Sequence, residues 1–138
     1  MKNAASELKT TKSLIKIFTL NFYIFINNNK KMAKFEISKD KREEFRFNLK
    51  AGNGQTILAS EGYKAKTSCL NGIESVKKNS QEDKRFDRLE SKNGKHYFNL
   101  KATNGQIIGS SEMYNSVSAM ENGIASVRKN APIADTVE

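Results

Sequence analysis

The 138-residue chain has few of the residues that build disulfides, metal centres and fibrous proteins. Its single cysteine, Cys69, excludes an internal disulfide and a zinc site of several cysteines, and suggests a reducing compartment. Its single histidine, His96, excludes a centre with several histidine ligands. One proline and eight glycines exclude fibrous and low-complexity architectures. Hydrophobic residues make up 37% of the chain, with eight phenylalanines, which is enough apolar material for one small domain.

Positive charge is distributed unevenly along the chain. The formal net charge is +9, and residues 1–31 contribute +5 through six lysines and one acid. Residues 32–138 contain 18 basic and 14 acidic side chains, a net charge of only +4. Since a nucleic-acid-binding domain concentrates cations on its folded part, this distribution gives such a function little support.

Residues 1–31 differ in composition from the rest. The stretch LIKIFTLNFYIFI at 14–26 is mostly apolar but short for a membrane-spanning helix. Lysines precede it, as in a secretory signal, yet no small-x-small cleavage site follows. Three interpretations stay open: translated upstream sequence or a non-structural extension, a signal or anchor, and a functional helix. Because Met32 is typical of a natural start, we expect a non-core leader and a cytoplasmic protein, exported or membrane-associated only if the leader acts as a signal or anchor.

An internal repeat of 51 residues dominates the remaining chain. Residues 47–80 align with 98–131 without a gap, and 19 of these 34 positions are identical. Chance does not give such a match, and missing a repeat would misassign the fold. We therefore divide the chain into repeat 1 at 32–82 and repeat 2 at 83–138, the latter with a short C-terminal tail.

Each repeat shows the pattern of three strands followed by a helix. In the second strand apolar and polar residues alternate, which is typical of a strand with one buried face. The apolar positions of repeat 1 are Phe45, Phe47, Leu49 and Ala51, and those of repeat 2 are His96, Phe98, Leu100 and Ala102. A short apolar strand precedes it at 35–37 and 85–89, and Asn93-Gly94 predicts the intervening turn in repeat 2.

The next turn decides which side chains share a face. A two-residue turn would pair position 49 with 58, whereas a three-residue turn over residues 52–54 pairs 49 with 57 and 47 with 59. Burial favours the second, which predicts that Ile57 and Ala59 join the apolar face. Gly54 and Gly105 should then adopt the left-handed conformation of a G1 bulge.

Apolar residues at helical spacing predict the helix of each repeat. Its buried stripe is Cys69, Ile73 and Val76 in repeat 1, and Met120, Ile124 and Val127 in repeat 2. Ser116 is a predicted N-cap, and Asn79 and Asn130 are predicted to end the helices in the left-handed conformation. Gly72 and Gly123 in mid-helix indicate a close approach to the sheet.

These features together resemble the YegP-like family, small bacterial tandem-repeat proteins without an established function. The resemblance rests on the repeated strand, the Asn-Gly turn, the Ser-Glu-x-Tyr segment and the helix ENGIASVRKN at 121–130, and covers about residues 33–131. Repeat 1 departs from it with Cys69-Leu70 in place of Met120-Glu121. The resemblance implies an α+β fold in which two β(3)-α units pack as a pseudo-twofold dimer, with one antiparallel sheet covered by two helices. It leaves open an exchange of strands between units, supplies no catalytic residues and has no counterpart of the leader.

The search for catalytic or metal-binding groups is negative. Cys69 lies on the buried helix stripe and His96 takes the place of Phe45, so we expect a core cysteine and a packed or rim histidine rather than a nucleophile and its base. The acidic pairs Glu43-Glu44 and Glu82-Asp83 lie in charged turns, where carboxylates are usually solvated. We therefore expect no enzyme, no cofactor and no metal.

Polar residues repeated at equivalent positions of a strand and its turn make the candidate interaction face. These residues are Asn48, Lys50, Gln55, Asn99, Lys101 and Gln106. We expect a non-catalytic interaction module that binds an unknown protein partner or itself, with recent duplication as the plain explanation of the identities. The alternative is a weak nucleic-acid-binding protein that uses a basic sheet face of Arg46, Lys50, Tyr97 and Lys101. A small ligand in the central groove is a third option that no motif supports.

Overall fold

A computed structural model describes residues 16, 19–21 and 32–138 of the chain. Residues 16 and 19–21 are helical and exposed, and the rest of the predicted leader lies outside the described residues. Met32–Glu138 form a unit of their own. Among the helices of the described residues, none is long and apolar enough to cross a membrane.

Both repeats form three strands and then a helix, in the predicted order. Repeat 1 contains β1 (Lys34–Lys39), β2 (Phe45–Lys50), β3 (Thr56–Ala59) and α2 (Lys66–Asn79). Repeat 2 contains β4 (Phe86–Glu90), β5 (His96–Lys101), β6 (Ile107–Ser110) and α3 (Val117–Asn130). Short 3-10 turns follow the helices, η1 (Asp83–Arg85) and η2 (Ala131–Ile133), and a last strand, β7 (Asp135–Val137), follows η2.

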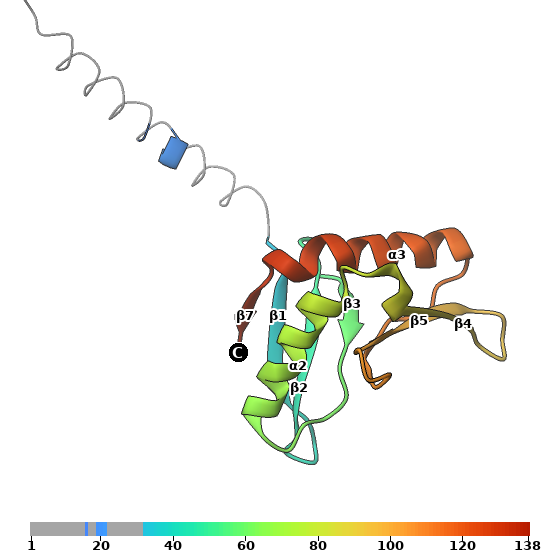
Figure 1. Cartoon of the computed structure of the whole chain (residues 1–138), viewed down its shortest axis with the longest axis horizontal. Helices are drawn as coiled ribbons and strands as arrows, with labels where there is room; N and C mark the ends of the chain where they lie inside the picture. Colours follow the sequence, from blue (N-terminus) through green and yellow to red (C-terminus); the bar gives the residue numbers. More distant parts are fainter. Residues whose placement is uncertain (1–15, 17–18, 22–31) are drawn as a thin grey trace, which may run out of the picture. The chain divides into compact units, whose positions relative to one another are not determined.

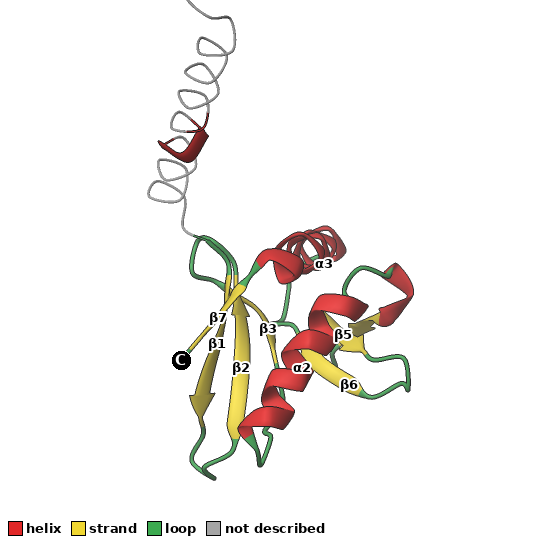
Figure 2. Cartoon of the chain, turned by 60° about the vertical axis from the view of Figure 1, so that its left-hand side comes forward, coloured by secondary structure: helices red, strands yellow, loops and turns green. Residues whose placement is uncertain are grey.

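The two repeats join into one seven-stranded sheet with the order β4-β5-β6-β3-β2-β1-β7. The join is between β3 and β6, where Ala59 pairs antiparallel with Ser110. These two residues occupy equivalent positions of the repeats, so a pseudo-twofold axis passes between them. Both helices cover the same face of the sheet (Figures 1 and 2). This arrangement confirms the predicted α+β pseudo-dimer.

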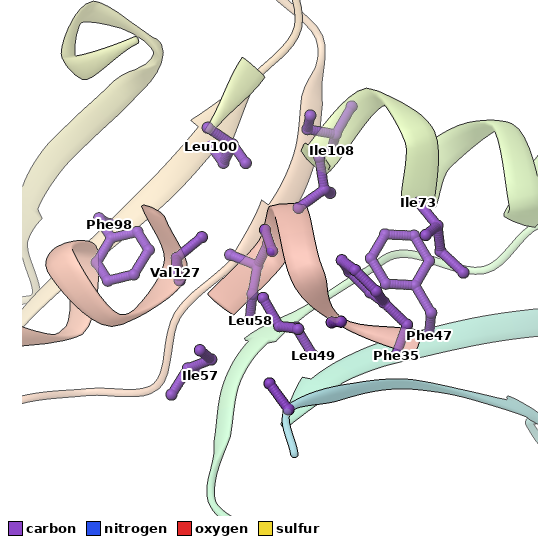
Figure 3. Packing of buried hydrophobic residues seen from close by; sticks show 14 of the residues in the cluster. Phe35, Phe47, Leu49, Ile57, Leu58, Ile73, Phe98, Leu100, Ile108 and Val127 are labelled. Atoms are coloured by element: carbon purple, nitrogen blue, oxygen red, sulfur yellow. The ribbon is translucent and has the colours of Figure 1, made fainter. Parts of the chain in front are cut away.

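The core lies between the two helices and this face. Phe47, Leu49, Phe98 and Leu100 are fully buried. The side chains of the two predicted helix stripes are also buried. Leu58 lies in the middle of the cluster, between side chains of both repeats (Figure 3). One core therefore serves both halves, which is what two units of this small size require.

The same aromatic arrangement recurs in each half of the core. In repeat 1 the ring of Phe47 meets Phe35 edge-on, with centroids 5.7 Å apart, and stacks on Tyr63 at 6.3 Å. In repeat 2 the corresponding distances, from Phe98 to Phe86 and Tyr114, are 5.6 and 6.4 Å. Edge-on and offset contacts at such spacings stabilise aromatic clusters beyond the burial of their area.

The strand register corrects one prediction. The three-residue turn is present, with Gly54 at φ +86° and Gly105 at φ +85°. Beyond it, however, a second bulge sets Leu49 opposite Leu58 rather than Ile57. Two consecutive side chains, Ile57 and Leu58, therefore enter the core, and Ala59 points to the opposite face instead of joining Phe47.

The helix ends agree with prediction only in part. Ser116 caps α3 by accepting a hydrogen bond from the N–H of Ala119, as predicted. The left-handed ends were wrong, because Asn79 and Asn130 do not have positive φ. Their side-chain amides instead donate to the residues four positions earlier, Ser75 and Ser126.

The hairpin between the first two strands differs between the repeats at one backbone position. Gly94 has φ +79°, and its equivalent in repeat 1 is Glu43, at φ +62°. A side chain in this left-handed conformation is strained. The turn is held in place by Asp40, whose carboxylate accepts from the N–H groups of Arg42 and Glu44.

The strands of each repeat stay together, so β1 to β6 are not exchanged between repeats. The C-terminal strand is the exception: β7 runs from repeat 2 to the far edge of repeat 1, where it pairs parallel with β1. Ala131, the first residue of η2, and Ala134, the residue after it, are buried. This seventh strand breaks the pseudo-twofold symmetry, and the repeat pattern of three strands and a helix gives no sign of it.

Candidate interaction surface

The face of the sheet opposite the helices carries the strand residues predicted to interact. Asn48 on β2 and Asn99 on β5 alternate with buried core residues and are half-buried on this open face. They lie in one cross-strand row, with Ala59 and Ser110 between them. Three strand spacings give a separation of about 14 Å along the row. The Ser110 hydroxyl donates a hydrogen bond of 2.7 Å to Asn99, so the row is short, polar and locally fixed.

The two predicted lysines are paired with acids on the neighbouring strands. Lys50 Nζ lies 2.7 Å from the Glu36 carboxylate on β1. Its equivalent, Lys101, lies 2.5 Å from Asp87 on β4. The hydrogen bond from Lys50 lowers the pKa of Glu36 from its ordinary value. The lysines therefore form two cross-strand ion pairs rather than a free basic surface.

The two predicted glutamines lie in the turns after these strands. Gln55 and Gln106 are exposed, and each backbone N–H donates to the side chain of the asparagine two residues earlier, at Asn53 and Asn104. Because β2 and β5 run in opposite directions across the pseudo-twofold axis, the two turns lie at opposite ends of the sheet. The six predicted residues thus form two equivalent halves, with the asparagine row between them, and not one compact patch.

The other basic residue proposed for nucleic acid is also paired. Arg46 donates from Nε to Asp40 at 2.7 Å, and this bond lowers the pKa of the Asp40 carboxyl group. Tyr97 lies opposite Leu89 on the edge hairpin of repeat 2. Each of the three predicted cations on this face therefore already has a carboxylate partner.

Cys69 and His96 lie in structural positions. Cys69 is fully buried in the core, and burial raises the pKa of its thiol, which disfavours the reactive thiolate. His96 exchanges two backbone hydrogen bonds with Tyr114. Among the described residues no group of three or more metal-binding side chains comes together.

Two repeated serines, Ser60 and Ser111, have a structural role that the sequence did not reveal. The Ser60 hydroxyl accepts from the N–H of Phe47 at 2.9 Å and donates to the carbonyl of Glu61. Ser111 does the same for Phe98. These hydroxyls replace a backbone partner next to the bulge, which explains the repeated serine.

A charged cluster beside β4 was also missed. Arg88 donates to Glu121 on α3, at 2.5 and 3.1 Å, and to Asp83 at 2.9 Å. The equivalents of the first two residues in repeat 1 are Ile37 and Leu70. In the sequence, the only sign of this ion pair is that Arg88 and Glu121 differ from the residues at the equivalent positions of repeat 1. The candidate interaction face was instead predicted from residues that are identical in the two repeats.

Comparison with known proteins agrees with this architecture. A family described as a domain of unknown function (DUF1508) matches residues 40–87 and 91–138. The chain is 57% identical over 104 residues to a UPF0339 protein in the ptx operon 5' region of Stutzerimonas stutzeri, covering 75% of this chain and 94% of that protein. It is 56% identical over 96 residues to the UPF0339 protein YegP of Escherichia coli K12, covering 70% and 87%.

Two solved structures are similar to this fold. The solution structure of YegP from E. coli, titled a protein of unknown function, has a TM-score of 0.73 at 51% identity and covers 76% of this chain and 90% of that one. The solution structure of UPF0339 protein SO3888 from Shewanella oneidensis has a TM-score of 0.71 at 49% identity, covering 77% and 93%. These names and titles state no activity. The predicted family is confirmed: the chain belongs to the DUF1508 family of UPF0339 proteins and carries two tandem copies of its domain.

Proposed function

We propose that the chain is a non-catalytic interaction module that binds a protein partner through the open face of its sheet. The observation that carries this proposal is the central row formed by Asn48, Ala59, Ser110 and Asn99. Its side chains are short and lie next to the pseudo-twofold axis, so the middle of the face offers small and polar groups to a partner. Such groups suit contact with another protein, whereas a small molecule prefers a concave and mostly apolar site.

The ion pairs on either side of the row support the same proposal. Glu36–Lys50 and Asp87–Lys101 border it in equivalent positions. Paired charges of both signs at the rim of a surface favour a correct orientation of the partner more than they add affinity. The pseudo-twofold repetition of the border also suits a partner that is itself twofold, such as a second copy of the chain.

The nucleic-acid alternative gains no specific support. A phosphate group would have to compete with the carboxylates of Asp40, Glu36 and Asp87 for the three cations on this face. Binding to phosphates releases counterions and therefore weakens steeply with salt. Retention of mixed RNA and DNA oligonucleotides by the full chain, lost as salt is raised, would favour this alternative over the proposal.

The proposal is tested by placing a bulky charge in the centre of the row. The full chain and its Ala59→Arg variant are used as baits with the same cell extract, and each captured protein is then purified and titrated against both. We expect a partner whose affinity falls at least tenfold in the variant, because one arginine at the centre of an interface blocks close contact.

Ser118→Arg is the matched control, because Ser118 is an exposed residue of α3, the helix that covers the opposite side of the sheet. Circular dichroism confirms that both variants are folded. A partner retained by Ser118→Arg and lost by Ala59→Arg supports the proposal. Partners that bind all three forms equally, or none that binds the purified chain, would contradict it.

A further inference from the structure

The two outer edges of the pseudo-symmetric part of the sheet are occupied differently. The edge of β1 is covered by β7, which pairs in parallel through Lys34–Asp135, Phe35–Thr136 and Glu36–Val137. The equivalent edge in repeat 2 is that of β4, which ends the strand order. No strand of residues 32–138 pairs with it, so a position filled at one end of the sheet is vacant at the other (Figure 1).

The backbone of β4 is oriented to receive another strand. Phe98 on β5 directs both its N–H and its carbonyl to Ser111 on the side of β6. Arg88 lies opposite Phe98. Residues opposite each other in an antiparallel pair either bond to each other or both point outward, so the N–H and carbonyl of Arg88 point away from β5. By the same alternation those of Phe86 point to the open edge, as those of its equivalent Phe35 point toward β7.

A hollow lies beside the β4 edge in repeat 2, at the place where the equivalent surface of repeat 1 is covered by the chain. It has a volume of about 450 Å³ between β4 and α3, and is lined by Asp83, Arg88, Glu121, Ile124, Ala125, Arg128 and Lys129. On the corresponding flank of α2, the chain passes through η2 with Ala131 and Ala134 buried and continues into β7. The chain thus shows on repeat 1 how a segment covers a helix flank and then adds to the sheet.

Charge indicates the chemistry of the segment that fits. In the existing pair, the acidic Asp135 lies opposite Lys34. The equivalent of Lys34 is Arg85, the last residue of η1, which already pairs with Glu82 at 2.9 Å. In the hollow, Arg88 pairs with Glu121 and Asp83, and Arg128 lies 3.7 Å from Asp83, so the three cations and two acids of the lining leave a net charge of only +1. An added carboxylate would therefore share Arg85 with Glu82. An acidic residue followed by β-branched residues, as in Asp135-Thr136-Val137, therefore suits the β4 edge.

We propose that the β4 edge binds an extended segment of a partner protein, in which a carboxylate precedes β-branched residues, as an added parallel strand. Backbone hydrogen bonds to Phe86 and Arg88 hold the segment, and the carboxylate lies opposite Arg85. This inference goes beyond the proposed function, which concerns the open face of the sheet. Addition of a strand to a sheet edge is a common way to bind an extended peptide.

A symmetric contact of β4 with the β4 of a second copy fits this edge less well. A symmetric dimer of β4 edges is antiparallel, and its twofold axis then sets one residue opposite itself. Near the middle of β4 that residue is Asp87 or Arg88, so a like-charge pair forms at the axis. The parallel segment avoids this repulsion.

The probe is a synthetic peptide with the sequence of residues 131–138, titrated into the isotope-labelled full chain and followed by the amide resonances. We expect shifts at residues 85–90, and none with a scrambled peptide. Arg88→Pro removes the outward N–H of an edge position, whereas Arg88→Ala keeps it and matches the loss of the side chain. We expect binding to Arg88→Pro to be about tenfold weaker than to Arg88→Ala, from one lost backbone hydrogen bond.

The remaining outcomes overturn the proposal. Shifts confined to β1 would mean that the peptide only exchanges with β7, and equal affinity for the two Arg88 variants would exclude strand addition. Binding of the peptide to Arg88→Ala but not to the wild type would mean that the Arg88 side chain prevents strand addition at this edge. Ala59→Arg should leave peptide binding unchanged, so that failure at the edge and failure of the open face are measured separately.

Discussion

At the residue scale, a glycine in each helix makes room for a tyrosine from the segment before it. A Cβ atom added to Gly72 would lie 2.5 Å from the Tyr63 hydroxyl oxygen and 3.1 Å from the ring of Phe47. One added to Gly123 would lie 2.7 Å from Cζ of Tyr114. The tyrosine rings thus pack closely against the helices at these glycines. Their partial burial raises the pKa of both phenol groups.

We predict that Gly72→Ala destabilises the fold, although alanine favours a helix. The gain in helix propensity is about 1 kcal/mol, whereas overpacking of a core costs about 1–3 kcal/mol. A net loss of about 1 kcal/mol in the free energy of unfolding is expected, measured by urea denaturation. Adding Tyr63→Phe removes the nearest atom and should reduce that loss. A Gly72→Ala variant more stable than the wild type would show that the helix is not held close to Tyr63.

The sequence predicted the close approach but not its cause. Repetition of Gly72 and Gly123 indicates that a helix lies near the sheet, and repetition of Tyr63 and Tyr114 indicates a structural role for them. Nothing in their spacing connects the tyrosine with the glycine, because eight residues and a change from strand to helix lie between the two members of each pair. The contact becomes evident only in three dimensions.

At the scale of single elements, the bulge in β3 shows where pattern analysis fails. Alternation predicts one buried residue in two, so Ile57 was expected inward and Leu58 outward. The bulge turns both inward against Leu49. Two adjacent buried apolar residues give no alternating signal, and the predicted position of Ala59 was wrong for the same reason.

The ion pair between β4 and α3 gives a prediction for stability against pH. Hydrogen bonding from Arg88 lowers the pKa of Glu121 below its ordinary value of 4.5. A carboxylate with a lowered pKa in the folded state stabilises the fold above its unfolded pKa, and the contribution is lost as pH falls through the folded pKa.

Glu121→Gln should therefore be less stable than the wild type above pH 4.5, and the difference should shrink as the pH is lowered below that value. Its size is expected to be less than about 1 kcal/mol, because solvent screens a partly exposed pair. Unfolding by urea at a series of pH values measures it. In an Arg88→Met background the pH-dependent difference should disappear, and its persistence there would assign it to another partner.

At the scale of the whole molecule, the duplication explains most of the fold and the differences between repeats explain the rest. Two matching β(3)-α units predicted one shared core, and the family resemblance implied one sheet covered by two helices. The C-terminal strand β7 and the Arg88–Glu121 pair lie where the repeats differ, and so comparison of one repeat with the other did not reveal them. The predicted surface residues were found on the open face and in its turns, but their separation into two halves follows from the orientation of the pseudo-twofold axis, which no local pattern records.

The repeats also differ at the axis itself, where the two halves meet. Leu58 of β3 is fully buried, and its equivalent in β6 is Gly109. A Cβ atom added to Gly109 would lie 2.7 Å from both Cγ and Cδ2 of Leu58. One side chain therefore fills the space that two equivalent leucines would contest, and this complementarity joins repeat 1 to repeat 2.

The most direct test of the shared core is a double-mutant cycle between these two residues, measured as free energies of unfolding. Gly109→Ala should destabilise the wild type by about 1–3 kcal/mol through overpacking. Leu58→Ala should cost about 2–5 kcal/mol through the cavity that it leaves. In the Leu58→Ala background, Gly109→Ala should be neutral or stabilising, because the new methyl group enters the vacated space. Strictly additive effects of the two substitutions would contradict the docking of the halves across β3 and β6.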